Sequence, residues 1–592
     1  MTSDFDRRRF LAFVPLVAAG RATGADVPPA VREAEARRVA VVAKVTPAVV
    51  AVCKPGGDAS GSGVLIDPAG YALTNFHVTD DVGPVHTCGL PDGELYDSVL
   101  VGHDPVGDLA LVKLLPKEPG KPFPFVPLGD SDAVKQGDWS LAMGNPFGVA
   151  RDFTPSVTFG LISGTHRYQP PAGDGILEYT DCLQCDTSIN PGNSGGPLFN
   201  LAGELVGING RGQFDKRGRI NSGAGFAISV NQCKHFLPHL RAGLLCDHAS
   251  LGAGVETDAE GGNLARMLVR QILEDSDAYR RGLREGDRLV RFAGRPLTSV
   301  NHYKNVLGIH PAGWRLPLVY RRGTADTAIL VRTQPTRSEA ADDPGEQPKP
   351  PRPPKKGPKT DAPQAEPSPA AKLYEPKAGF ANLHFNRLER DRLLASFRKL
   401  TGDPVGLAGP WTISGRVQLS DRKSPFSLTL ADAADGTTEV KLARGTVTDT
   451  VQPLKPGQPL GELLQPTGSG GLLASLYLWR RLVALGEKGF ESGFAHGGQE
   501  PFYPAGTPAP VAWCEVLRTK HAAFEAKWFF QPGNATLVGC EAVFAKDEDP
   551  CELVFADPKP VGDRTLPHRI EARSGDRRYA VLTVTAYKLG AT

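Results

Sequence analysis

The sequence predicts a mostly β protein that ends in a separate α+β unit with an antiparallel sheet. From about Val49 to Ile228, short apolar runs alternate with glycine and proline turns, a pattern typical of a β-barrel or sandwich. Between Pro335 and Pro369 there are eleven prolines and hardly an apolar side chain, which indicates a spacer. Alternating strands and two helical stretches resume after residue 373. Because single cores rarely exceed about 250 residues, the 592-residue chain should hold several domains.

Charge and cysteine content exclude several classes of protein. The net charge is +2, and no basic block with interleaved aromatic residues is present, so a nucleic-acid partner is not expected. Nine cysteines are an odd number, and their wide spread does not suggest a disulfide framework. Cys182 and Cys185 form the one close pair, but they lie in an extended segment where residues three apart point to opposite faces. We therefore expect no metal site and no cofactor.

The N-terminus has the features of an export signal. Arg7, Arg8 and Arg9 precede an apolar run from 11 to 20 and a stretch of small residues, which resembles a twin-arginine signal cleaved after Ala25. The apolar run is too short to span a bilayer comfortably. The alternative is a disordered basic N-terminus. Pro28 and Pro29 then open a helix predicted over 31–44.

The glycine-rich segment 190–198 places Ser194 where it could act as a nucleophile. A serine hydroxyl needs a base to take its proton and donors to stabilise the resulting oxyanion. Glycines on both sides would let the backbone N–H groups of Gly192 and Ser194 point at one spot. The same letters satisfy the G-x-S-x-G elbow of α/β-hydrolases, so the motif alone leaves two classes of enzyme open.

Chain order separates these two classes. A β-hairpin follows Ser194, with a turn at 200–203, so the partner residues must lie upstream, in the order His, Asp, Ser. His77 stands at the end of a strand over 71–73. Asp108 stands directly before an alternating strand over 109–113. Asp104 competes with Asp108, but it precedes a proline and is typical of a turn.

Six segments in this order resemble the HtrA/Deg serine proteases, which implies a chymotrypsin-like double β-barrel over roughly 45–235. By this resemblance His77 is the general base, Asp108 orients it and Ser194 is the nucleophile. The oxyanion hole lies at Gly192, Asn193 and Ser194. The segments are Gly61–Ile66, Thr74–Val78, Asp108–Lys113, Leu128–Ser131, Gly144–Gly148 and Asn190–Leu198.

The strand Gly225–Ile228 resembles the family strand that lines the specificity pocket, and Ile228 and Ile189 would favour a small or medium aliphatic residue before the cleaved bond. Ser229 stands where relatives commonly have proline, and the charged loop 211–221 is typical of a solvated segment. At Ser229 and in this loop the sequence departs from the family pattern that would set the specificity.

Residues 246–335 resemble a PDZ domain, which binds peptides by strand addition. Leu251, Gly252 and Ala253 would form the loop that captures a peptide C-terminal carboxylate, and 276–287 would form the helix and turn that follow. Asp277 stands where relatives usually have proline. A purely structural role for this domain is the alternative.

The C-terminal unit has no clear motif. Helices are predicted over 383–400 and 472–485, strands over 411–419, 425–430, 438–442, 511–517, 524–530, 552–555, 568–572 and 579–586, and a hairpin at Asp435-Gly436. This pattern predicts an antiparallel sheet with helices on one side. It is similar to the lipoprotein-carrier fold, because Leu566–Ile570 precede a final hairpin. The proline-rich spacer should isolate this unit mechanically.

The predicted organisation is a signal over 1–25, a trypsin-like protease domain over 26–245, a PDZ domain over 246–335, a disordered linker over 336–372 and an α+β domain over 373–592. The resemblance implies an exported, ATP-independent serine endopeptidase of the periplasm or cell envelope. It would act as a trimer or larger assembly on misfolded or unstructured proteins, in protein quality control. The alternative is a chaperone or binding scaffold with secondary protease activity, whose C-terminal domain binds a lipid, a lipoprotein or an envelope partner.

Overall fold

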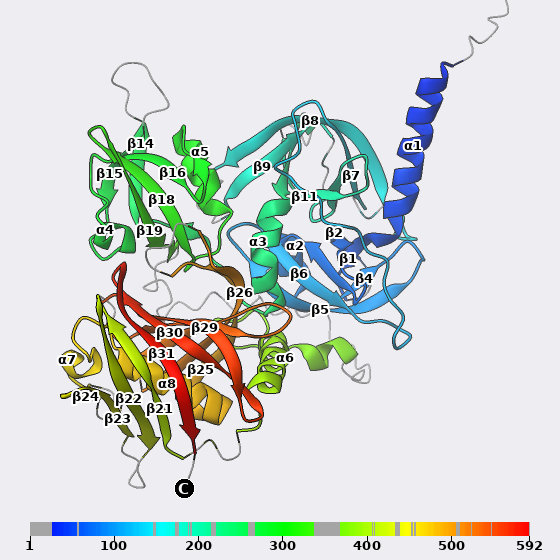
Figure 1. Ribbon diagram of the computed structural model, residues 1–592. Helices are drawn as coiled ribbons and strands as arrows, with labels where there is room; N and C mark the ends of the chain where they lie inside the picture. Colours follow the sequence, from blue (N-terminus) through cyan, green and yellow to red (C-terminus); the bar gives the residue numbers. More distant parts are fainter. Residues whose placement is uncertain are drawn as a thin grey trace, which may run out of the picture.

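The protein is described by a computed structural model with two closed β-barrels, a smaller third sheet unit and a large C-terminal sheet (Figure 1). It describes residues 27–590 except 56–57, 146–147, 149, 172–176, 188, 190–191, 215–220, 258–266, 337–367, 405–406, 408, 433–437, 452–453, 455–456, 505–508, 523 and 546–547. The expected signal, most of the charged loop 211–221, most of the linker and the Asp435-Gly436 turn lie outside the described residues.

The first barrel closes in the strand order β1-β2-β3-β6-β5-β4. Helix α1 (Pro29–Val45), with proline in its first turn, and a short 3-10 helix, η1 (Thr46–Ala48), lead into it. All five residues of β1 are buried, which the apolar run of valines explains. The elements of this barrel are β1 (Val49–Cys53), β2 (Ala59–Leu65), β3 (Tyr71–Thr74), α2 (Phe76–Val82), β4 (Val85–Gly89), β5 (Leu95–Asp104) and β6 (Leu109–Leu114).

The second barrel closes in the order β10-β11-β12-β9-β8-β7, so the expected double barrel is confirmed. The predicted hairpin after Ser194 is present as the antiparallel pair β10 and β11, with Gly203 N–H bonded to Asn200 C=O at 3.1 Å. The elements are β7 (Trp139–Gly144), β8 (Ser156–Gln169), β9 (Tyr179–Cys185), β10 (Pro197–Phe199), β11 (Leu205–Phe214), β12 (Asn221–Ser229) and α3 (Val230–Arg241).

The third unit has a sheet in the order β14-β15-β16-β18-β19, with β14 at one edge. Helix α5 lies between this sheet and the second barrel, as Figure 1 shows. The elements are β13 (Ala249–Ser250), β14 (Ala253–Thr257), β15 (Met267–Ile272), α4 (Asp277–Arg280), β16 (Arg288–Phe292), β17 (Arg295–Pro296), α5 (Val300–Gly308), β18 (Arg315–Arg322), β19 (Ala325–Arg332) and β20 (Gln334–Pro335).

The C-terminal unit is one antiparallel sheet of eleven strands, in the order β24-β23-β22-β21-β31-β30-β29-β28-β27-β26-β25. Twelve of the fourteen residues of α8 are buried, because this apolar helix contacts strands from both halves of the sheet. The elements are η4 (Pro369–Leu373), α6 (Leu383–Thr401), β21 (Trp411–Leu419), β22 (Arg422–Asp432), β23 (Thr438–Arg444), β24 (Val447–Val451), α7 (Leu460–Leu463), α8 (Leu472–Leu485), η5 (Gly486–Gly489), β25 (Ser492–Phe502), β26 (Ala512–His521), β27 (Phe524–Phe530), β28 (Leu537–Val543), β29 (Cys551–Val561), β30 (Arg564–Ser574) and β31 (Arg577–Leu589).

The C-terminal unit packs against both preceding parts of the chain, so the prediction that it is mechanically isolated is wrong. Ala370 and Phe385 belong to the apolar core of the barrels. The side chain of Asn382 donates to the carbonyl of Leu100 at 2.7 Å, and that of Asn386 to Ala242 at 2.8 Å. The proline-rich composition of the spacer is evidence about the spacer alone, and it does not report how the residues after it pack. The residues directly after it carry apolar and amide side chains that dock on the first barrel.

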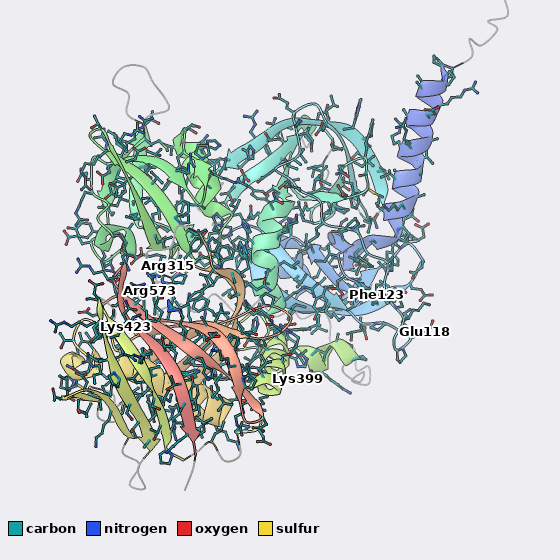
Figure 2. The ribbon with its side chains drawn as sticks, viewed as in Figure 1. Glu118, Phe123, Arg315, Lys399, Lys423 and Arg573 are labelled. Carbon is teal, nitrogen blue, oxygen red and sulfur yellow. The ribbon has the colours of Figure 1, made fainter. Side chains whose placement is uncertain are left out.

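Buried charges join the third unit to the C-terminal sheet. Arg315 of β18 is 3% exposed and pairs with Glu552 of β29, which is 1% exposed. Figure 2 shows Arg315 at the boundary between the two units. Arg332 pairs with Glu541, and Lys527 donates to the carbonyl of Gly313 at 3.2 Å. The two units therefore share a buried polar interface.

Within the described residues, no helix combines the length and the apolar composition needed to cross a bilayer. All nine cysteines are buried, and none of them forms a disulfide within the part of the chain that the structure describes. Cys182 and Cys185 lie in different apolar clusters, which agrees with the prediction that they point to opposite faces of β9.

Candidate active site

His77 and Asp108 meet at the edge of the first barrel. His77 was expected at the end of a strand. It lies instead in the first turn of α2, directly after β3. Its Nδ1 is 2.8 and 3.0 Å from the two carboxylate oxygens of Asp108, and its main-chain N–H donates to Asp108 Oδ1 at 3.0 Å. This arrangement places the ring proton on Nδ1 and leaves Nε2 as the nitrogen that can accept a proton.

Asp108 is held rigidly before β6. Its side chain is fully buried, whereas the side chain of His77 is 42% exposed. Its φ of 58° lies in the left-handed region, which is uncommon for residues other than glycine. The Asn75 side chain donates to the Asp108 carbonyl at 2.9 Å, and Phe76 N–H donates to the same oxygen at 3.2 Å. A strained backbone conformation of this kind is kept only where many surrounding contacts hold it, which is often the case at functional sites.

Asp104, the competing carboxylate, has a different partner. It is fully buried at the end of β5, and both of its oxygens lie 2.9 Å from Nε2 of His248. One of them also accepts the Gly107 N–H at 3.0 Å. Burial acts to lower the pKa of His248, but the Asp104 carboxylate more than offsets this, so the pKa is raised. Asp104 therefore fixes the turn that leads to Asp108.

Ser194 lies where the two barrels meet. Its main-chain carbonyl accepts the N–H of Ser62 in the first barrel at 2.8 Å. A Cβ on the next residue, Gly195, would lie 2.2 Å from the Ser62 carbonyl and 3.0 Å from the N–H nitrogen of Asn75, so this loop packs against the segment that leads into His77. The Ser194 hydroxyl donates to the carbonyl of Gly210 at 3.3 Å.

Ser62 also fixes the backbone on the N-terminal side of Ser194. Its hydroxyl donates to the carbonyl of Gly192 at 2.6 Å and accepts the N–H of Asn145 at 2.9 Å. Gly192 has a φ of 102°, a conformation that strongly favours glycine. Asn193 is buried, at 2% exposed. The predicted oxyanion segment is thus tied to the first barrel by one buried hydroxyl that the sequence motif does not include.

Tyr179 is a further residue of this site that sequence reasoning missed. It is 2% exposed, and its hydroxyl donates to Oδ2 of Asp108. The two residues are 71 positions apart and belong to different barrels. No local pattern reports such a contact, and only the packing of β9 against the first barrel reveals it.

The predicted specificity residues do not share one apolar cluster. Ile189 packs beside Gly225, where an added Cβ would lie 2.7 Å from its Cδ1. Ile228 pairs with Ile208 and belongs to the larger core of the barrels. Both isoleucines are buried, at 2% and 1% exposed. The structure therefore places the side chain of Ile189 beside Gly225, whereas that of Ile228, further along the same strand, packs into the larger core of the barrels.

The predicted carboxylate loop of the third unit is bonded within that unit. Leu251 is 1% exposed and belongs to its core. The Gly252 N–H donates to the Ser250 hydroxyl at 3.1 Å. The Ala253 carbonyl accepts the Tyr303 hydroxyl at 3.0 Å. The Gly252 N–H and the Ala253 carbonyl thus each have a partner within the third unit.

Two groups of side chains within the described residues have the spacing to hold a cation, one formed by Asp132, His166 and Asp181 and one by Glu389, His496 and Glu515. In the first, Arg295 already pairs with both aspartates, at 2.7 and 2.9 Å. In the second, Arg392 pairs with both glutamates. In each group an arginine thus already pairs with both carboxylates, so these side chains form ion-pair clusters.

The first of these groups lies at the contact of the second barrel with the third unit. The hydrogen bond with Asp181 raises the pKa of His166, against the effect of burial. The Asp181 N–H donates to Asn305 of α5 at 2.8 Å. A polar cavity of about 560 Å³ lies beside this contact, between β8 and the start of α5.

Comparisons with known proteins place this site in a family. A trypsin-like peptidase domain matches residues 61–208. The putative serine protease HhoA of Synechocystis sp. is 35% identical over 295 residues, which is 47% of this chain and 71% of that protein. The periplasmic serine endoprotease DegP of Salmonella typhimurium is 34% identical over 290 residues, 48% of this chain and 58% of DegP.

Among solved structures, the HtrA-type protease AlgW with a tripeptide is 31% identical, over 51% of this chain and 98% of that one, with a TM-score of 0.42. The chain spans about half the length of the curated relatives that it matches first, 54% and 52% in two Chlamydia proteins. The matched part includes His77, Asp108 and Ser194 within one trypsin-like domain. Because HhoA is 35% identical and is covered to 71% of its length, the chain belongs to the HtrA-type serine proteases.

Proposed function

We propose that the protein is a serine-type endopeptidase in which Ser194 attacks a peptide carbonyl. The observation that carries this proposal is the pairing of His77 Nδ1 with the fully buried Asp108 carboxylate, at the junction where the glycine-rich loop presents Ser194. The names of the relatives, serine protease and serine endoprotease, support the same activity. A reaction of this kind requires no cofactor.

In the proposed reaction, His77 Nε2 takes the Ser194 proton as the hydroxyl attacks, and later returns it to the leaving amine. A hydroxyl carries one proton, so Ser194 must turn away from the Gly210 carbonyl before transfer. Asp108 stabilises the imidazolium that forms. The N–H groups of the 192–194 segment would stabilise the oxyanion, and the positive φ of Gly192 supports this role.

The proposed substrates are unfolded or misfolded proteins in the periplasm or cell envelope, the compartment in the names of the DegP relatives. Export by the segment 1–25 is part of this proposal. The third unit would bind peptide C-termini as a PDZ domain, which the edge position of β14 supports.

A trimer or larger assembly is proposed as the working form. The second barrel exposes a stacked pair, Trp139 and Phe159, whose rings are 4.5 Å apart. They are 48% and 38% exposed, and Val157 beside Phe159 is 38% exposed. Contiguous exposed apolar side chains of this kind favour an interface.

The test is digestion of casein by the purified protein beside Ser194→Ala, His77→Ala and the double variant. Because nucleophile and base act as a unit, each single change should remove nearly all turnover, and the double variant should be little worse. Asp108→Asn should lose on the order of 10⁴ in rate, since it would hold His77 in the wrong tautomer. Additive losses, or a near-normal Asp108→Asn enzyme, would contradict the assignment.

The same experiment distinguishes a chaperone or binding scaffold. A cavity of about 100 Å³ in the C-terminal unit, lined mainly by apolar side chains that include Phe397, Trp479 and Phe555, favours an apolar ligand there. If native protein and Ser194→Ala both leave casein intact, suppress its aggregation equally and carry co-purified lipid, binding is the principal function.

A further inference from the structure

Tyr179 joins the two halves of the candidate active site. Its hydroxyl donates to Oδ2 of Asp108, the same oxygen that lies 2.8 Å from Nδ1 of His77. One carboxylate oxygen therefore accepts from both the tyrosine and the histidine. Because Tyr179 is on β9 and Asp108 is in the first barrel, this contact holds the acid from the opposite barrel.

Gly210 makes room for the tyrosine ring. A Cβ built on Gly210 would lie 2.4 Å from Cε1 and 2.7 Å from the hydroxyl oxygen of Tyr179, and the three nearest atoms all belong to that ring. The backbone of Gly210 is not in the left-handed region, so its conformation would accept other residues. The ring of Tyr179 is thus what excludes a side chain at this position.

The carbonyl of Gly210 accepts the Ser194 hydroxyl at 3.3 Å. Tyr179 therefore packs against the residue that holds the nucleophile while its hydroxyl binds the acid. A tyrosine that served only the core would need neither contact, since its ring is already 2% exposed in the apolar cluster shared by the barrels.

We propose that Tyr179 is a positioning residue for peptide hydrolysis: its hydroxyl holds the Asp108 carboxylate in the orientation that orders His77, and its ring fixes the Gly210 strand against which Ser194 rests. The proposal rests on the serine endopeptidase function proposed above. The tyrosine touches neither substrate nor reacting atoms, so it should act on the rate of the chemical step and not on substrate binding.

The first measurement uses Tyr179→Phe, which keeps the ring and removes the hydroxyl. A hydrogen bond to a charged group should be worth about ten- to a hundredfold in rate. We expect kcat on casein and the rate at which a fluorophosphonate labels Ser194 to fall by that factor, with KM within about twofold. Tyr96→Phe is the matched control, because the Tyr96 hydroxyl donates to the exposed Asp92 at 2.7 Å in the first barrel. It should react at the native rate.

The second measurement moves the hydroxyl beside Asp108 from position 179 to position 210. Gly210→Ser in the native background should lower the labelling rate, because the ring leaves no space for its side chain. In a Tyr179→Ala background the same substitution places a hydroxyl in the vacated space beside Asp108, and it should raise the rate at least about tenfold over Tyr179→Ala alone. In the same Tyr179→Ala background, Gly210→Ala fills the space without a hydroxyl and should not raise the rate, whereas a purely structural tyrosine would give Gly210→Ser and Gly210→Ala the same effect.

The outcomes are separable. The proposal for Tyr179 would be overturned if Tyr179→Phe were labelled at the native rate, or if Gly210→Ser had the same effect in both backgrounds. Neither result would bear on the serine endopeptidase function. If Tyr179→Ala does not fold, as judged by its melting curve, Tyr179→Phe decides by itself. Folded native protein that the fluorophosphonate does not label would overturn the serine endopeptidase function, and this inference with it.

Discussion

Asp104 and Asp108 lie four residues apart and hold two different histidines. Asp108 orients His77, and Asp104 holds the buried His248 at the start of the third unit. Protonated His248 contributes stability that is fully present below its unfolded pKa of about 6.5 and is lost as pH rises through its raised folded pKa. The two carboxylates thus bind different histidines, and only Asp108 takes part in the proposed reaction.

Asp104→Asn should therefore lower the free energy of unfolding by about 3–5 kcal/mol near pH 6, because it removes one partner of a fully buried pair. The deficit should shrink as pH rises above the pKa of His248, where native protein loses the same contribution. Denaturant unfolding at pH 6 and pH 8.5 measures this difference. Asp92→Asn, at an exposed carboxylate of the same barrel, is the control, and a deficit of equal size at both pH values would contradict the assignment.

At this scale the sequence favoured Asp108 over Asp104 as the partner of His77, because the alternating strand over 109–113 follows Asp108 directly. The structure pairs His77 with Asp108. The sequence was not sufficient to find Tyr179 or Ser62. Neither belongs to the nucleophile motif, and each reaches the site by crossing from one barrel to the other. Residues that act through tertiary packing leave no local spacing to detect.

At the scale of elements, β8 and β9 carry the contact between the second barrel and the third unit. Burial alone would raise the pKa of Asp181, but the hydrogen bond from His166 and the charge of Arg295 lower it. Its contribution to stability is present above its unfolded pKa of about 3.9 and is lost as pH falls through the lowered folded value. The pKa of His166 is raised, so its contribution to stability is present below its unfolded pKa of about 6.5. That contribution is lost as pH rises through the raised folded value. The contact should be strongest at mildly acidic pH.

Asp181→Asn should accordingly loosen α5 on the barrel, since it weakens the pairs with His166 and Arg295. We expect amides of α5 and β9 to exchange hydrogen about tenfold faster than in native protein at the same pH, with the C-terminal sheet unchanged. Asp326→Asn is the control, because Asp326 pairs with Arg321 on the exposed β18–β19 hairpin, where such pairs contribute little. Equal exchange in both variants would show that this contact does not hold α5.

Elements with clear boundaries were predicted closely. Helix α8 begins and ends as expected, between Gly471 and Gly486, and α6 is one residue longer than predicted. Strands β21 and β27 also match. Strands β24, β25 and β28 were missed, and the sheet order could not be predicted, because the pairing of β21 with β31 joins segments far apart in the chain.

At the scale of the whole molecule, the C-terminal unit completes the protease part. A chain stopped after residue 336 would remove Ala370 and Phe385 from the core of the barrels and expose Leu100, which packs against Ala381. We therefore expect it to melt at a lower temperature than the full chain and to lose activity on casein. Scanning calorimetry and casein digestion on both chains test this. A truncated chain that retains the native melting temperature would show that the C-terminal unit does not stabilise the barrels.

Arg315→Ala tests the same interface without deleting residues. Removing Arg315 from its buried pair with Glu552 should cost about 3–5 kcal/mol, whereas Arg315→Met combined with Glu552→Leu should recover most of the loss. Arg321→Ala, at an exposed pair on the same strand, is the matched control. If Arg315→Ala and Arg321→Ala are equally mild, the buried charges do not join the two units.

The residues on both sides of 337–367 make contacts that do not depend on an unbroken chain between them. On one side, Thr336 N–H bonds to the carbonyl of His248 at 3.2 Å. On the other, Ala370 is buried in the core and Asn382 is bonded to Leu100. A cut within 337–367 should therefore leave two polypeptides that remain together as one particle. The last unit could equally be produced as a separate molecule and added back to its own protease.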